Sequence, residues 1–215
     1  MFTTLMAAAL AADVSFVPAD AEQGLPAFIA FEGIVERGDA RAVKALVKAH
    51  NCKLVLIASP GGSAFEGLEL YDMAVEQELH TTAVGFGAWS AAAMFWMGGT
   101  QQTILPSSQV GFHFAYDGWT GEPAPQWWHA TVGARVRDSI ERTKAFKDIN
   151  GITDMTLGQW QEAYDRYGTA GFFVWQSDDE GNITTAVIDS SAPTSAAPTQ
   201  VREFMKSKRQ TLETK

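Results

Sequence analysis

The sequence predicts an α/β fold in which helices cover a largely parallel sheet. Apolar runs of strand length alternate with segments whose apolar residues recur at helical spacing. Leu54–Ala58 is a continuous apolar run rich in β-branched residues, which is typical of a strand that is covered on both faces. Turns rich in glycine, proline and serine separate several of these segments. This alternation indicates right-handed crossovers between neighbouring strands and a layered α/β architecture.

The predicted elements of the first half follow one another with short connections. A first strand is expected at Ala27–Phe31, and Asp39 is expected to cap the next helix, in which Val43 and Val47 recur on one side. The remaining segments are a strand at 54–58, a helix at 64–78, a strand at 80–85, a helix at 91–98, and strands at 102–105 and 110–114.

The second half begins with a loop that is rich in tryptophan. Trp119, Trp127 and Trp128 occur among glycines and prolines within residues 116–128, and such a cluster is expected at an interface or in a lid. The elements predicted after the loop are a helix at 129–150, a helix at 156–166, a strand at 172–176, a turn at 178–182 and a strand at 183–188.

We expect a single main domain at residues 25–189, preceded by a leader at 1–24. Residues 190–215 are predicted to be a linker followed by a charged, solvated tail. The leader has an apolar stretch at 5–12 and a small-x-small cleavage pattern at Ala19-Asp20-Ala21, yet no basic residue occurs before Arg37. The cytoplasm is therefore the favoured location, and export through a cleaved signal peptide stays open.

Composition and charge exclude several classes of function. The hydrophobic share of 46% indicates a globular protein, and the net charge of −9 argues against nucleic acid as the main partner. The single cysteine, Cys52, can form neither an intrachain disulfide nor a cysteine-based metal site. His50, His80 and His129 lack metal-ligand spacing, so we expect no metal and no cofactor. No apolar run is long enough to predict a membrane span.

Ser90 is the leading candidate for a nucleophile. It follows the glycine-rich segment Gly85–Ala88 and precedes an alanine run, a pattern typical of a strand that turns tightly into a buried helix. The unpaired N–H groups and the positive dipole end at a helix start stabilise a developing negative charge. Taken alone, however, a serine at this position is more often a helix N-cap.

His113 and a glycine pair supply the partners that a nucleophilic serine needs. His113 ends the strand that comes one helix and one further strand after Ser90, so neighbouring strand ends can bring the two together. The backbone N–H groups of Gly62 and Ala91 are the predicted donors to an oxyanion, since the Gly61-Gly62 pair permits a close approach. Taken alone, a histidine between two phenylalanines would usually belong to the core.

In this order the motifs resemble those of the serine peptidases of the Clp protease proteolytic-subunit family, in the ClpP/crotonase superfamily. The resemblance covers residues 28–173. The motifs that carry it are Ser59-Pro60-Gly61-Gly62-Ser63, Gly87-Ala88-Trp89-Ser90-Ala91-Ala92 with Gly98-Gly99, and Val110-Gly111-Phe112-His113. It implies a ClpP/crotonase-like layered fold of repeated β-β-α and βα units, with the helix at 129–150 as a projecting handle.

The resemblance also implies roles for individual residues. Ser90 would be the nucleophile, His113 the general base, and Gly62 with Ala91 the oxyanion hole. Asp165 is the first choice for the third member of the triad and Asp154 the second, and a Ser-His dyad stays open. The implied partners are a peptide or protein substrate and further copies of the chain, and an ATPase partner stays open.

Two departures from the family pattern support alternative functions. Trp89 stands where the family has a small residue, and the tryptophan-rich loop replaces a short glycine-rich hairpin. One alternative is a catalytically silent binding or assembly module, whose cleft is plugged by Trp89 and this loop. A less favoured alternative is an acyl-coenzyme A-processing crotonase relative, whose activity would not require Ser90.

Overall fold

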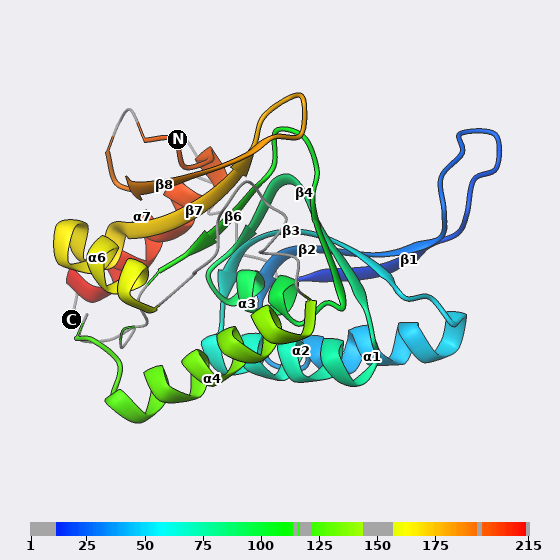
Figure 1. The fold of residues 1–215 in the computed structure, drawn as a ribbon, viewed down its shortest axis with the longest axis horizontal. Coiled ribbons are helices and arrows are strands. Elements are labelled where there is room, and N and C mark those ends of the chain that lie inside the picture. Colours follow the sequence, from blue (N-terminus) through cyan, green and yellow to red (C-terminus); the bar gives the residue numbers. More distant parts are fainter. Residues whose placement is uncertain (1–11, 114–115, 117–121, 144–156, 193–194, 214–215) are drawn as a thin grey trace, which may run out of the picture.

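The structure, a computed structural model, describes residues 12–113, 116, 122–143, 157–192 and 195–213 (Figure 1). Within these residues the chain forms a mixed eight-stranded sheet with helices packed against it, which confirms the predicted α/β fold. The strands are β1 (Asp13–Val17), β2 (Phe28–Val35), β3 (Leu54–Gly62), β4 (His80–Trp89), β5 (Gln101–Ile104), β6 (Gln109–Phe112), β7 (Gly171–Ser177) and β8 (Ile183–Asp189).

The helices connect the parallel strands in the first half and cover the sheet in the second. They are α1 (Asp39–His50), α2 (Ala64–Glu76), α3 (Ala91–Met97), α4 (Gln126–Thr143), α6 (Leu157–Tyr167) and α7 (Thr199–Glu213), with a short 3₁₀ turn at Gly168–Ala170. In the described part of the chain, no helix is both long and apolar enough to cross a membrane. The predicted helix at 129–150 is described as far as Thr143, and the rest of it lies outside the described residues.

Strand β4 pairs with two different strands along one of its edges, and this arrangement positions the site. The strand order is β1-β2-β3-β4-β6-β7-β8, with β5 also paired to β4. The first half of β4 pairs with β5, whereas its last residues pair in parallel with β6, Ala88 with Val110 and Trp89 with Gly111. The carboxyl ends of β4 and β6 therefore lie side by side, and each is followed directly by a predicted site residue.

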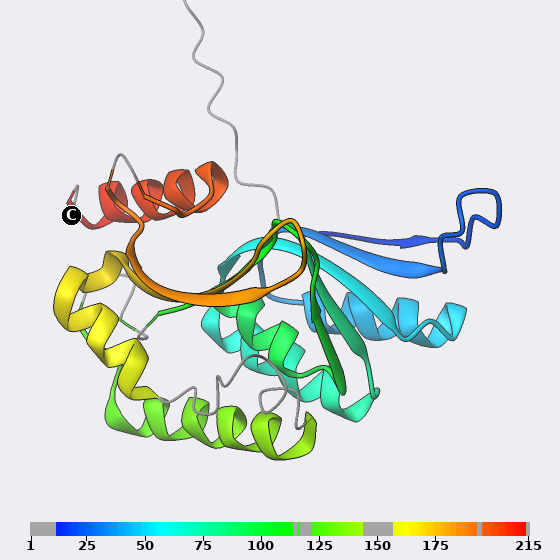
Figure 2. The ribbon, with the colours of Figure 1, turned by 45° about the horizontal axis from the view of Figure 1, so that its top comes forward.

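Two apolar clusters lie on opposite faces of the sheet. Phe173 and Trp175 of β7 belong to the larger cluster, which also holds the buried residues of α1, α2 and α3. Phe172 and Val174 belong to the smaller cluster, in which residues of α7 are buried. Because successive side chains of a strand point to opposite faces, α7 covers the face that α1–α3 leave open. Figure 2 shows α7 on the side of β7 and β8 that faces away from α4.

The structure corrects the predictions for both ends of the chain. Residues 13–17, placed in the leader, form β1 and pair antiparallel with β2. Residues 199–213, expected in a linker and solvated tail, form α7, of which Val201 and Met205 are buried. The apolar residues of α7 recur at positions 201, 204 and 205, a helical spacing that was available in the sequence. The many charged residues around them favoured a solvated tail instead.

The start of α1 also differs from the prediction. Gly38 is the N-cap and Asp39 is the first helical residue, whose carboxylate accepts a hydrogen bond from Glu36 N at 2.8 Å. The N–H of Ala40 donates instead to Oε1 of Glu66, a buried residue in the first turn of α2. The backbone N–H at the start of α1 is therefore satisfied by Glu66, a residue far away in the sequence, where the sequence suggested a local cap.

Candidate active site

Ser90 lies at a strained turn between β4 and α3. Its backbone has φ 55° and ψ −119°, a conformation that residues with a side chain rarely adopt. Such strain persists where surrounding contacts hold it, and here Ser90 N donates to Gly111 O of β6 at 2.8 Å. The Ser90 side chain makes no capping hydrogen bond to α3. Ser90 therefore occupies the N-cap position of α3, but its hydroxyl does not serve as the capping group.

The Ser90 hydroxyl is hydrogen-bonded to the imidazole of His113. Ser90 Oγ lies 2.6 Å from His113 Nε2, and His113 follows directly after the last residue of β6. The imidazole ring also packs against Phe172 and Tyr116, with centroid distances of 4.8 and 5.3 Å. At this distance a neutral imidazole can accept the hydroxyl proton as the oxygen attacks an electrophile.

The glycine pair at the end of β3 lies against the Ser90 turn. Gly61 has φ +97°, and a Cβ added there would lie 2.5 Å from Ser90 Cβ and 2.6 Å from Trp89 O. Ser59 is fully buried, and its Oγ accepts from Gly61 N at 3.1 Å, which holds the turn in place. Ser59 stands within the motif that carries the family resemblance.

Gly62 and Ala91, the predicted oxyanion-hole residues, line the same cavity as Ser90 and His113. Ala91 is the first residue of α3, and the first N–H groups of a helix have no partner within the helix. The structure thus places all four residues around one space. Donation by Gly62 and Ala91 to an oxyanion stays a prediction.

The cavity beside Ser90 has a volume of about 560 Å³ and is mainly apolar. Leu68, Met94, Trp128 and Val132 contribute to its wall, and no charged side chain occurs among its described lining residues. Volumes of this size are typical of sites that bind small molecules or parts of larger substrates. The space can therefore accommodate uncharged side chains next to the serine.

Trp89 points away from this cavity. It is fully buried in the smaller apolar cluster, where its ring packs edge-on against Phe172 and its Nε1 donates to Phe86 O at 2.8 Å. The ring lies over Gly111, where any side chain would overlap it. The expectation that Trp89 narrows or plugs the cleft is therefore wrong, because its ring is buried in the smaller cluster and does not line the cavity.

Two of the three predicted loop tryptophans lie at the cavity. Trp127 and Trp128 stand in the first turn of α4, Trp127 60% exposed and Trp128 buried. Phe65 at the start of α2 is 68% exposed and packs edge-on against Trp128, with centroids 4.8 Å apart. Trp119 lies outside the described residues. The exposed aromatic rings therefore form one rim of the cavity, which is compatible with either predicted role, interface or lid.

The structure does not bring Asp165 to the Ser90–His113 pair. It is exposed on α6, and its Oδ1 accepts a hydrogen bond from Nε2 of Gln161, one turn earlier on the same helix. Asp154, the second choice, lies outside the described residues. The identity of the group that orients His113 stays a prediction. Among the described residues, no group of histidine, cysteine and acidic side chains could hold a metal ion.

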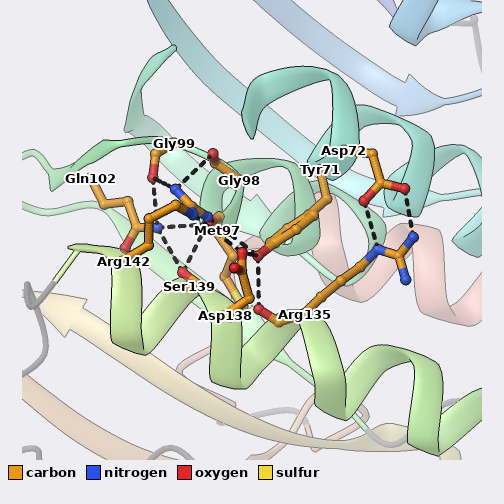
Figure 3. A network of polar contacts seen from close by, with 10 residues as sticks. All are labelled: Tyr71, Asp72, Met97, Gly98, Gly99, Gln102, Arg135, Asp138, Ser139 and Arg142. Carbon is orange, nitrogen blue, oxygen red and sulfur yellow. Dashed lines mark hydrogen bonds and ion pairs between the residues drawn. The ribbon is translucent and has the colours of Figure 1, made fainter. Parts of the chain in front are cut away.

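A polar network attaches α4 to α2 and to the end of α3 (Figure 3). Ser139 donates to Met97 O at 2.8 Å, and Arg142 donates to Gly99 O at 3.2 Å, so α4 side chains satisfy carbonyls at the C-terminus of α3. Tyr71 of α2 donates to a carboxylate oxygen of Asp138 at 2.5 Å. Helix α3, which begins directly after Ser90, is thus held by α4 at its C-terminus. The tryptophans that line the cavity also belong to α4.

We expect Tyr71→Phe to lower the free energy of unfolding by about 1–2 kcal/mol, because it removes the hydrogen bond to Asp138. This bond is the main cause that lowers the pKa of Asp138. The bond therefore stabilises the folded state at pH values above the ordinary pKa of 3.8, and this stabilisation is lost as the pH falls below that value. Urea unfolding at pH 7 and about pH 3 measures both effects. The difference between wild type and variant should shrink in acid.

The exposed Tyr167 provides the matched control for this measurement. Tyr167→Phe should leave the free energy of unfolding within about 0.5 kcal/mol of wild type. An equal effect of Tyr71→Phe at both pH values would contradict the role of the Asp138 carboxylate.

The fold and the arrangement of its site define the class of protein: an α/β protein with a ClpP-like peptidase fold. The family model for Clp protease matches residues 43–163, which is more than half of the chain. The chain belongs to the Clp protease family.

Two solved structures are similar to the chain, both at low identity. The first, a variant of the 1510-N membrane-bound stomatin-specific protease, is 13% identical with a TM-score of 0.40, and the match covers 52% of this chain. The chain spans only 60% of the length of that protein. The second, a variant of ClpP1 from Listeria monocytogenes, is 14% identical with a TM-score of 0.42, and the match covers 63% of this chain and 77% of that one. No curated protein matches the sequence.

Proposed function

We propose that the protein is a serine peptidase that hydrolyses peptide bonds with Ser90 as nucleophile and His113 as general base. The observation that carries the proposal is the 2.6 Å contact between Ser90 Oγ and His113 Nε2, made by a serine in a strained turn whose side chain makes no capping hydrogen bond. Membership of the Clp protease family supports a peptide or protein as the substrate.

The proposed reaction proceeds through an acyl-enzyme. His113 Nε2 takes the proton as Ser90 Oγ bonds to the carbonyl carbon, and the N–H groups of Gly62 and Ala91 receive the oxyanion. When the peptide C–N bond breaks, the imidazolium protonates the leaving amine. His113 then activates a water molecule, which attacks the ester and releases the acid with regeneration of the Ser90 hydroxyl.

Labelling with a fluorophosphonate tests this proposal. We expect a covalent adduct on Ser90, located by mass spectrometry of the digested protein, and we expect none in Ser90→Ala. Ser63 is the matched control, since it lines the same cavity but its Oγ accepts from Glu66 N as the cap of α2. Ser63→Ala should therefore still be labelled. A folded wild-type sample that stays unlabelled would refute the serine peptidase and favour a catalytically silent binding module.

The position of Trp89 weakens the reasoning behind the silent module, since its ring is buried in the smaller apolar cluster and does not line the cavity. The acyl-coenzyme A alternative also lacks support from the cavity. Its described lining contains no lysine or arginine to bind the phosphates of the coenzyme. An active Ser90→Ala variant with a thioester substrate would restore that alternative.

The orienting acid can be identified by exchanging candidate aspartates for asparagine. Loss of an orienting carboxylate lowers kcat by about 10⁴-fold in Ser-His-Asp sites. Because Asp165 is exposed and bonded to Gln161, we expect Asp165→Asn to change the labelling rate of Ser90 by less than about threefold. A loss of about 10³-fold or more would assign Asp165 to the triad, and the same loss in Asp154→Asn would assign Asp154.

Assembly into a homo-oligomer is part of the proposal, and family membership supports it. The exposed ring of Trp127 and that of Phe65 would lie at or near such an interface or at the entrance for the substrate. Sedimentation analysis of the purified chain measures the number of copies directly, and a monomer at all concentrations would contradict this part.

A further inference from the structure

The cavity at Ser90 extends to both faces of the sheet. On one side its lining includes Leu68, Trp128 and Val132, which belong to the larger apolar cluster. On the other side its lining includes Phe204 and Met205 of α7, which pack with the smaller cluster. Ser90 and His113 lie at the carboxyl ends of β4 and β6 and line the same cavity as both sets of residues.

We propose that α7 forms a second apolar subsite, on the opposite side of the Ser90–His113 pair from the wall made by α2 and α4. This proposal rests on the proposed peptidase function and specifies its substrates: peptides with apolar side chains on both sides of the bond that is cleaved. Phe204 is the residue of α7 that determines this preference.

The chemistry of the α7 side matches an apolar ligand. Phe204 is partly buried and Met205 is buried, and both line the cavity together with Tyr116, whose ring packs against His113. None of the described lining residues is charged, so a charged substrate side chain would lose its hydration there without gaining a partner. An apolar side chain gains by leaving water at the same place.

The position of α7 relative to the nucleophile is defined by buried contacts. Val201 and Met205 pack in the cluster that contains Trp89, the residue immediately before Ser90. Trp89 is itself held by its hydrogen bond to Phe86 O and by contact with Gly111. The helix that presents Phe204 is thus anchored on the strand that ends at the reacting hydroxyl. A subsite needs this fixed geometry in order to discriminate between side chains.

Cleavage-site profiling of the full chain tests the proposal. A peptide library is digested, and the residues on each side of every cut are identified by mass spectrometry. We expect apolar residues to be enriched on both sides for wild type. Phe204→Ala should lower the kcat/KM preference for leucine over alanine on one side by about tenfold and leave the other side unchanged. Phe204→Leu, which keeps an apolar side chain, should restore most of the preference.

Two matched variants separate a subsite from a structural role. Glu203→Ala changes the exposed neighbour of Phe204 on α7 and should leave both preferences unchanged. Val132→Ala changes the wall on the α4 side and should affect only the opposite preference. If Phe204→Ala lowers the melting temperature, Phe204→Trp replaces it in the experiment. The larger tryptophan ring should fill the subsite and so lower the same preference for leucine over alanine.

An unchanged profile in the Phe204 variants, or apolar enrichment on only one side in wild type, would overturn the α7 subsite while leaving a peptidase. Failure of the peptidase itself looks different: wild type would cleave no peptide and Ser90 would stay unlabelled, which overturns both proposals.

Discussion

Replacing His113 by alanine is expected to lower the rate at which Ser90 reacts with a fluorophosphonate by about 10³-fold or more. The Ser90 hydroxyl is a weak nucleophile by itself, and the ring nitrogen 2.6 Å away is positioned to remove its proton during attack. The second-order labelling rate constant, measured at pH 7 on variants with unchanged melting temperature, gives the effect directly.

His80 provides the control for this experiment. It begins β4, the strand that ends next to Ser90, and therefore lies at the opposite end of the same element. His80→Ala should keep the labelling rate within about threefold of wild type. If Ser90 and His113 act as one unit, as proposed, the double variant Ser90→Ala/His113→Ala should be no less active in peptide hydrolysis than Ser90→Ala alone. Unchanged labelling in His113→Ala would contradict the catalytic pair.

Replacing Gly61 by alanine is expected to disrupt the site and the fold together. The new Cβ would lie 2.5 Å from Ser90 Cβ and 2.6 Å from the Trp89 carbonyl oxygen, and the backbone there has φ +97°. Neither neighbour can move without shifting the turn that carries Ser90. We expect a loss of about 3 kcal/mol or more in the free energy of unfolding. Labelling of the remaining folded protein should fall by at least about 100-fold.

Gly38 is matched to Gly61 in backbone conformation but not in surroundings. Its φ is +108°, and an added Cβ would meet nothing within 4 Å. Gly38→Ala should therefore cost about 1 kcal/mol for the strained backbone and leave labelling of Ser90 unchanged. Urea unfolding and labelling rates measured on both variants separate the two causes. Equal losses in the two variants would show that backbone strain, and not the contact with the Ser90 turn, dominates at Gly61.

Local patterns in the sequence were sufficient to predict most elements, and together with the family resemblance they made Ser90 and His113 the candidate site residues. Leu54–Ala58 and the helical spacing of Val43 and Val47 predicted β3 and α1, although β3 continues to Gly62. The prediction fell short there because the residues from Ser59 to Gly62 have a weak strand propensity and are held in the sheet by tertiary pairing, Gly61 and Gly62 with β2 and Ser59 with β4. Register between distant strands is a tertiary property that a single-sequence pattern does not contain.

The direction of Trp89 and the role of α7 were the main features that sequence reasoning missed. Alternation along a strand separates its side chains into two faces, yet it does not say which helix covers which face. A tryptophan beside Ser90 was therefore expected in the cleft, although it lies in the cluster beneath α7. The charged residues of 199–213 suggested a solvated tail, because burial of Val201 and Met205 depends on a sheet face that only the folded chain presents.

The sequence by itself determined the α/β order of elements, the glycine-rich turns and the order in which the glycine pair, Ser90 and His113 follow one another, since these depend on propensity and spacing along the chain. Tertiary structure decided the rest. Division of β4 between β5 and β6 brings Ser90 Oγ to 2.6 Å from His113, and packing on the second face of the sheet brings Phe204 to the same cavity. These features depend on contacts between residues that are far apart in the chain, which local propensities do not specify.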